Sequence, residues 1–409
     1  MFPIFVLSVS LWLLFSGCSS GPRQPGFTIA VNAGAEGDAL KAAVEDYGHL
    51  HPELKIQTVV LPYASLFEKE LLDVTFGTGS YDVIMMDDPW FPRMAEHGKL
   101  TPLEREPDAD FIPTCIAICR EPYHTGQLYA LPYVGNSQLF FYRKDLYDKY
   151  GLGEPKTWDD VLAAARTIGP AEKMFGYVMR AAQGNAVVAD YMALFWSFGA
   201  EMFDARGDAA VNSAESIAAL RFMIQLGHYA PPGYVSFNAD EVSAHLLQGT
   251  AVQSINWPAW IPAMDDPAKS RVVGKIAYGL MPGEKRSGAA EIGNWLLGVP
   301  AKSRNVAAAR DFVYWVTEAK QMRLAALRGN PPTRHSLFAD PELRARFRAY
   351  VVQEQSLATS RPRPRTPYWN EIENTFGVYL SKANSGKMTP EEAMDHANRE
   401  IQAILERTR

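Results

Sequence analysis

The stretch FTIAVNAGAEGDALKAAVEDYGHLHPELKIQTVVLPYASLFEKELLDVTFGTGSYDVIMMDDPW, residues 27–90, decides the fold class. Three short apolar runs in it are separated by two segments whose apolar residues recur at the period of an amphipathic helix. Strands that alternate with helices in this way predict a mostly parallel sheet, because each helix returns the chain through a right-handed crossover. We therefore expect an α/β fold, with strands at 28–31, 55–61 and 81–86 and helices at 38–47 and 65–76.

Ligands of such sheets gather at the carboxyl ends of the strands. The loops that follow these strands contain residues suited to a polar molecule with a flat face, namely Glu36, Tyr63, Asp87, Asp88 and Trp90. Adjacent residues at a strand end point in different directions, so Asp87 and Asp88 are poorly placed to flank one bond as a catalytic pair. We expect one of them to accept hydrogen bonds from a ligand and the other to cap a following helix.

A second α/β unit begins near residue 138. Its first strand is expected at 138–142, and a capping box of Thr157 and Asp160 opens the next helix. Further helices are expected at 187–198 and 214–226 and after Thr389, and further strands at 251–256, 275–281 and 294–299.

The N-terminus has the pattern of an export signal. Residues 1–17, MFPIFVLSVSLWLLFSG, are uncharged, almost wholly apolar and shorter than the roughly 20 residues that a permanent membrane helix needs. The sequence FSGC at 15–18 resembles a bacterial lipobox, although Phe15 replaces the usual Leu and no basic residue precedes the apolar core. An ordinary cleaved signal with an incidental cysteine is the alternative. We expect a signal peptide at 1–17 and a tether at 18–26, lipidated at Cys18, that holds the exported chain to a membrane.

The composition excludes several classes of protein. The chain has 409 residues, 47% of them hydrophobic, and a net charge of −6, which allows more than one core and leaves no broad cationic surface for nucleic acid. Cys115 and Cys119 lack the spacing of metal ligands and either pair or remain buried thiols. GxSxG, HExxH and P-loop motifs are missing, so we expect no catalytic residue, metal site or cofactor. The stretch SRPRPRTP at 360–367 is interpreted as a stiff connector, with a polybasic membrane patch or a partner motif as the alternatives.

Several motifs follow one another along the chain in a specific order. They are YDVI at 81–84, GKLTPL at 98–103, LYALPY at 128–133, FYRKDL at 141–146, PKTW at 155–158 and GNW at 293–295. In this order the sequence resembles the family 1 extracellular solute-binding proteins, the sugar-binding subunits of ABC importers and relatives of maltose-binding protein. The resemblance implies the type II periplasmic-binding-protein fold, with two discontinuous lobes. It places lobe 1 at 27–133 and 296–352, lobe 2 at 136–292 and 360–409, and hinge crossings at about 131–136, 291–295 and 350–362.

The resemblance also implies a ligand held between the lobes. Carbohydrates stack their C–H faces on aromatic rings and hydrogen-bond to planar polar groups. We expect ligand contacts from Glu36, Tyr63, Asp88, Trp90, Asn136, Trp257, Trp260, Asn294, Trp295 and Trp369.

The implied function is that of a transport receptor. We expect a monomer that captures a sugar, polyol or small glycoside outside the cytoplasmic membrane and delivers it to a permease with a cytoplasmic ATPase. A secreted glycoside-active enzyme and a receptor for amino acids, glycerol phosphate or polyamines remain alternatives, although the density of tryptophans argues against small charged ligands.

Overall fold

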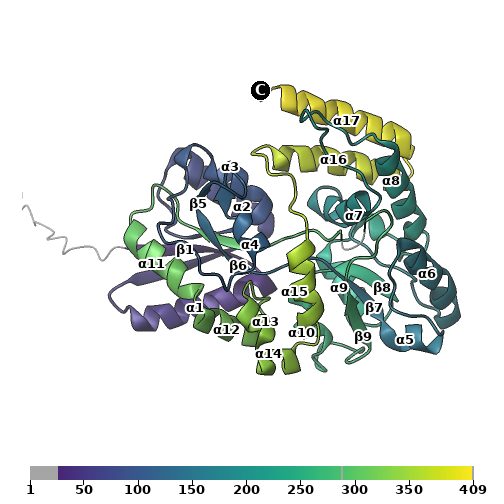
Figure 1. Ribbon diagram of the computed structural model, residues 1–409, viewed down its shortest axis with the longest axis horizontal. Helices are drawn as coiled ribbons and strands as arrows, with labels where there is room; N and C mark the ends of the chain where they lie inside the picture. The colour runs from purple at the N-terminus through teal and green to yellow at the C-terminus, as the bar shows by residue number, and fades with distance from the viewer. Residues whose placement is uncertain (1–25, 287–288, 408–409) are drawn as a thin grey trace, which may run out of the picture.

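The computed structural model describes residues 26–286 and 289–407, which form two α/β lobes (Figure 1). The predicted signal peptide at 1–17 and all but the last residue of the predicted tether at 18–26 lie outside the described residues. Within the described ranges, no helix combines the length and the apolar character that a membrane span requires.

The first lobe is built on a mixed sheet. Strand β1 (Gly26–Asn32) pairs in parallel with β2 (Lys55–Leu61), and a parallel bridge from β1 at Ile29 leads to Val83, just before β3 (Ile84–Asp87). The predicted parallel arrangement is confirmed for these three strands.

The rest of that sheet departs from the parallel prediction. Strand β10 (Trp295–Gly298) lies antiparallel between β3 and β6 (Ala130–Val134). The direction changes because β10 enters the sheet from the other lobe and not through a helical crossover. The lobe 1 helices are α1 (Ala35–Leu50), α2 (Tyr63–Phe76), α3 (Phe91–Ala95), α4 (Pro113–Ala117), α11 (Val306–Val316), α12 (Ala319–Leu327), α13 (His335–Ala339) and α14 (Pro341–Arg346), with short elements η1 (Asp88–Trp90), η2 (Glu96–Gly98), β4 (Arg120–Glu121) and β5 (Gln127–Leu128).

The second lobe has its own sheet, in which β7 (Leu139–Arg143) lies antiparallel between β8 (Gln253–Asn256) and β9 (Ile276–Gly279). The predicted capping box is present, because the Asp160 N–H donates to Thr157 Oγ1 at 3.1 Å and the Thr157 N–H donates to Asp160 Oδ2 at 2.9 Å. The lobe 2 helices are α5 (Lys144–Lys149), α6 (Trp158–Glu172), α7 (Asn185–Ser197), α8 (Ala214–Gly227), α9 (Ala239–Leu247), α10 (Ile261–Met264), α16 (Trp369–Asn384) and α17 (Pro390–Glu406), with η3 (Tyr234–Ser236) and η4 (Pro258–Trp260).

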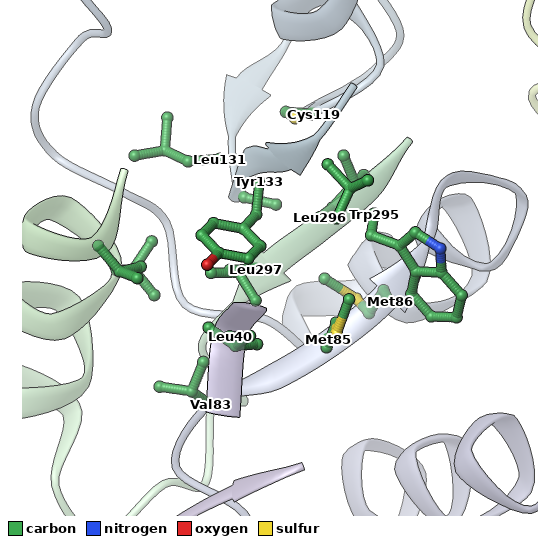
Figure 2. Packing of buried hydrophobic residues seen from close by; sticks show 14 of the residues in the cluster. Leu40, Val83, Met85, Met86, Cys119, Leu131, Tyr133, Trp295, Leu296 and Leu297 are labelled. Carbon is green, nitrogen blue, oxygen red and sulfur yellow. The ribbon is translucent and has the colours of Figure 1, made fainter. Parts of the chain in front are cut away.

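The hydrophobic cores follow the lobes. One cluster draws on residues between 27 and 134 and between 292 and 357, and Figure 2 shows part of it, where Trp295 and Leu296 of β10 lie near Met86 of β3. A second cluster draws on residues between 140 and 290 and between 369 and 404, and a smaller third one lies beneath α9 and α10. Helix α15 (Tyr350–Thr359) lies at the junction, because Tyr350 packs in the first cluster and the preceding Ala349 in the third. The lobe and hinge boundaries themselves remain predictions.

Cys115 and Cys119 lie in and just after α4. Both are free, buried thiols, and Cys119 Sγ donates to the Cys115 carbonyl oxygen at 3.3 Å. Burial raises the pKa of Cys115 to about 12, so its thiol stays protonated at neutral pH. Of the two alternatives, buried thiols are therefore correct.

Candidate ligand site between the lobes

Asp87 and Asp88 lie where β3 meets η1, at the carboxyl end of a lobe 1 strand. Asp87 is the cap of η1, because its Oδ1 accepts a hydrogen bond from the Asp88 N–H at 3.0 Å. Its Oδ2 accepts another from the Tyr63 hydroxyl at 2.7 Å. The Asp88 carboxyl group, which is completely buried, is left for other partners.

Arg363 is one of those partners, and its guanidinium group lies near four carboxyl groups. Its side chain is 2% exposed, and its Nη2 lies 3.0 Å from Asp88 Oδ1 and 3.3 Å from Asp87 Oδ1. Its Nε lies 3.4 Å from Glu291 Oε1, and its Nη1 lies 3.8 Å from Glu373 Oε1 on α16. One guanidinium group thus lies among carboxyl groups from lobe 1, from the second predicted crossing and from lobe 2.

The other arginines of the stretch SRPRPRTP attach it to both lobes. Arg365 donates to the carbonyl oxygens of Asp88 and Ile118, each at 2.8 Å. Arg361 pairs with Glu201 at 2.9 Å on the lobe 2 side. The stretch is therefore more than the connector that the sequence suggested, since its arginines are part of the junction between the lobes.

Burial raises the pKa values of the acids around Arg363. The pKa of Glu291 rises to about 8 and that of Asp88 to about 6, because in each case loss of solvation outweighs the attraction of Arg363. The pKa of Glu373 is raised for the same reason. The carboxyl groups of Glu291 and Asp88 therefore change protonation state near neutral pH, and each accepts hydrogen bonds when ionised and can also donate one when protonated.

Several of the aromatic residues expected to touch a ligand pack into the cores. Trp90 and Trp295 are 1% and 4% exposed, and their rings meet edge to face with centroids 5.6 Å apart. The Tyr63 ring lies 4.7 Å from that of Trp90 and 6.0 Å from that of Trp295. Trp369 is fully buried in the lobe 2 core at the start of α16. Ligand contact by these four residues remains a prediction.

Trp257 directly precedes the short η4 helix, Trp260 is its last residue, and both are only half-buried. The Trp257 ring packs against Gly293, where a Cβ atom would lie 2.7 Å from it. The guanidinium carbon of Arg180 lies 5.2 Å above the centre of this ring, and Arg180 is itself buried and paired with Asp190. Trp260 packs instead against the third hydrophobic cluster.

Glu36, Asn136 and Asn294 supply polar groups to the same junction. Glu36 lies in the first turn of α1, and burial together with the negative charge of Asp87 raises its pKa to about 7, while a hydrogen bond from Asn136 opposes the rise. The Asn136 carbonyl oxygen accepts from the Gly293 N–H at 2.8 Å, and the Asn294 carbonyl oxygen accepts from the Asp88 N–H at 3.0 Å. The structure thus links these residues to Asp87, Asp88 and the second crossing.

Buried acceptor atoms at this junction are left without donors. Among the described residues, Asn136 Oδ1, Asn294 Oδ1 and Glu291 Oε2 have no hydrogen-bond partner. Buried polar atoms are almost always hydrogen-bonded to protein, water or a ligand. The junction therefore suits a molecule that carries several hydroxyl or N–H donors.

Sequence reasoning missed Arg363, Glu291, Glu373 and Arg180. Glu291 had a positional signal, because it begins a predicted crossing, but Glu373 and Arg180 had none. In the described part of the chain, no three or more His, Cys, Asp or Glu side chains are arranged to hold a metal ion.

Comparisons with known proteins show the family and the fold of the chain. Residues 33–323 match the family described as bacterial extracellular solute-binding protein. A probable amino-acid ABC transporter periplasmic-binding protein of Sinorhizobium fredii is 29% identical over 76% of this chain and 73% of its own length. The mannitol-binding protein of Pseudomonas aeruginosa is 27% identical over 87% of this chain and 88% of its own. The solved structure of maltose-bound MalE3 of T. maritima has a TM-score of 0.86 and 26% identity, and the match covers 93% of this chain and 99% of that one.

Proposed function

Because the chain belongs to the bacterial extracellular solute-binding protein family, we propose that it captures a polyol or a sugar between its lobes and delivers it to the permease of an ABC importer. The observation that carries this proposal is the junction around Arg363. There, carboxyl groups surround a guanidinium group, and buried amide and carboxylate oxygens lack donors that the hydroxyl groups of a polyhydroxylated ligand can supply.

The proposed ligand contacts are of two kinds. Asp88, Glu291, Asn136 and Asn294 would hydrogen-bond to hydroxyl groups. The half-buried Trp257 would offer its ring to a C–H face. A family member of this kind works outside the cytoplasm, and its partner ATPase, not this chain, hydrolyses ATP.

A thermal-shift series tests the proposal. A ligand that binds only the folded state stabilises it by about 2.7 kcal/mol at one hundred times its Kd, so D-mannitol, ribitol, D-sorbitol and maltose should divide into binders and non-binders. A rise in melting temperature with any of them supports the proposal, and no rise across the series contradicts it. Release of new reducing ends from oligosaccharides would instead favour the alternative of a glycoside-active enzyme.

We also propose that the chain is a monomer tethered through lipidated Cys18 after removal of residues 1–17. The sequence FSGC at 15–18 and the abrupt change from apolar to small polar residues support this proposal. Cys18→Ala should move the full-length protein from the membrane fraction to the soluble extracytoplasmic fraction without changing sugar binding. A variant that stays in the membrane fraction would contradict the lipid anchor.

A further inference from the structure

Among the buried groups that meet between the lobes, carboxyl groups outnumber guanidinium groups. We propose that the ligand is an amino sugar or an amino polyol whose ammonium group lies beside Glu291. This inference rests on the proposed sugar-receptor function and names the chemical class of the sugar.

The carboxyl groups of Asp87, Asp88, Glu291 and Glu373 are buried, and two guanidinium groups, of Arg363 and Arg365, lie among them. Arg180 does not restore the balance, because Asp190 pairs with it at close range and is equally buried. Buried charges must be paired, so the cluster has to take up protons or a cation.

Glu291 is buried and only partly paired. Its carboxyl group is completely buried, and Oε2 has no hydrogen-bond partner among the described residues. Gln138 fixes its backbone from both sides: the Glu291 N–H donates to Gln138 Oε1 at 3.2 Å, and the Glu291 carbonyl oxygen accepts from the Gln138 N–H at 3.0 Å. The backbone of Glu291 is thus fixed, Oε1 has only the ion-pair contact with Arg363 at 3.4 Å, and Oε2 is unused.

The Glu291 side chain can exchange a proton for a cation. The raised pKa of Glu291, about 8, means that the carboxyl group holds a proton at neutral pH even with Arg363 beside it, as long as no ligand cation is bound. An ammonium group that donates to Oε2 would replace this proton, and the displaced proton would pass to the solvent buffer. The pair formed in this way is charge-assisted and stronger than a bond to a neutral hydroxyl.

An organic ammonium group fits this cluster better than a lysine of the chain or a metal ion. No lysine is among the buried residues in the described ranges, so the chain itself supplies no ammonium group to the cluster. The acids surround a guanidinium group and are not arranged as a metal cage. Asn136 Oδ1 and Asn294 Oδ1 still lack donors, which the hydroxyl groups of the same molecule can provide.

The experiment is isothermal titration with two matched pairs of probes. These are 1-amino-1-deoxy-D-sorbitol against D-sorbitol, and D-glucosamine against D-glucose, each in phosphate and in Tris at pH 7. The amino member of at least one pair should bind about tenfold tighter or more, because a charge-assisted hydrogen bond is roughly twice as strong as a neutral one. Its binding enthalpy should differ between the buffers, since a proton is released, while that of the neutral member should not.

Two variants locate the ammonium group. Glu291→Gln should reduce the amino-to-neutral affinity ratio to near one. The control Glu172→Gln, which removes an ion pair between the last residue of α6 and Lys149 of α5, should leave the ratio as it is. A ratio that Glu291→Gln does not change overturns the placement beside Glu291. If the Glu291 variant fails to fold, the number of protons that the unmutated protein releases on binding the amino member, measured from the two buffers, tests the inference.

The outcomes separate this inference from the proposed function. If the neutral members bind as tightly as the amino members and no proton is released, the inference of an amino group is contradicted, while the sugar-receptor function is still supported. If neither pair binds but D-mannitol or maltose does, the amino-sugar inference is contradicted and the sugar-receptor function is still supported. If none of these compounds binds, both proposals fall.

Discussion

Arg363 Nη2 lies 3.0 Å from Asp88 Oδ1, although the two residues are separated by 275 positions in the chain. Both side chains are almost completely buried, with exposed fractions of 2% and 0%. Asp88 begins η1, directly after strand β3 of lobe 1, and Arg363 lies in the stretch between the last residue of the first core cluster and the C-terminal residues of the second. The ion pair therefore joins the carboxyl end of a lobe 1 strand to the connection with the other lobe.

Replacement of Arg363 by Met should destabilise the protein. Removal of one partner from a buried ion pair typically costs about 3–5 kcal/mol, because the remaining charges are left without compensation. Urea unfolding at pH 7.5 measures this loss, and the loss should be smaller at pH 5, where the carboxyl groups take up protons. Arg206→Met is the control, since the Arg206 side chain is 81% exposed and should contribute less than about 1 kcal/mol. Equal losses in the two variants would contradict the assigned role of Arg363.

The stability of the ligand-free protein should fall as the pH rises from about 5 to 8. The pKa values of Glu291 and Asp88, about 8 and about 6, lie above those of free carboxyl groups. The folded state therefore holds more protons than the unfolded state in this window, and ionisation on raising the pH favours unfolding. The slope is at most about 1.4 kcal/mol per pH unit for each such proton.

Glu291→Gln tests the origin of this slope. It should flatten the part between about pH 6 and 8, while Glu172→Gln, where Lys149 lowers the pKa of the acid, should not affect that range. Urea midpoints measured at half-unit pH intervals give the comparison. A slope that is unchanged in the Glu291 variant would mean that another group carries the proton.

The elements could be predicted from the sequence more fully than the site. The strands and helices of residues 27–90 follow from local periodicity, which one short window contains. The antiparallel insertion of β10 and the burial of Arg363 depend on residues far apart in the chain, and no local pattern records them. The stretch SRPRPRTP has the composition of an exposed linker, so its inward arginines could be identified only from the fold.

Gly135 is a single residue whose role could not be predicted from the local sequence. In the sequence it is a glycine within a predicted hinge crossing, where freedom of rotation is the obvious reason for it. In the structure its backbone is not left-handed, and a Cβ atom would lie 2.0 Å from the Pro332 carbonyl oxygen. Gly293 is similar, since its Cβ would meet the Trp257 ring. Both glycines are explained by close approach of other groups.

Trp257→Ala and Trp295→Ala should have different effects. Trp257 is half-buried over Gly293, so its loss should have little effect on folding stability. It should weaken binding of the polyol or sugar that the thermal-shift series identifies by about 1–3 kcal/mol. Trp295 is 4% exposed within the lobe 1 core, so its loss should cost about 3–5 kcal/mol of folding stability. Titration calorimetry and urea unfolding on both variants measure the two quantities. Unchanged affinity in Trp257→Ala would mean that the ligand lies elsewhere.

Binding of a ligand between the lobes should close them. The proposed contacts come from Asp88 on lobe 1, from Trp257 on lobe 2 and from Glu291 at a crossing, so they can form together only when the lobes are close. A ligand shifts a conformational equilibrium by the difference between its affinities for the two forms, and closed-form contacts from both sides provide that difference. Small-angle X-ray scattering should therefore give a smaller radius of gyration at saturation with the polyol or sugar identified above, and no change with a sugar that does not bind. If the radius does not decrease at saturation, the site fills without a hinge motion, and the permease would need another feature to distinguish the loaded receptor from the empty one.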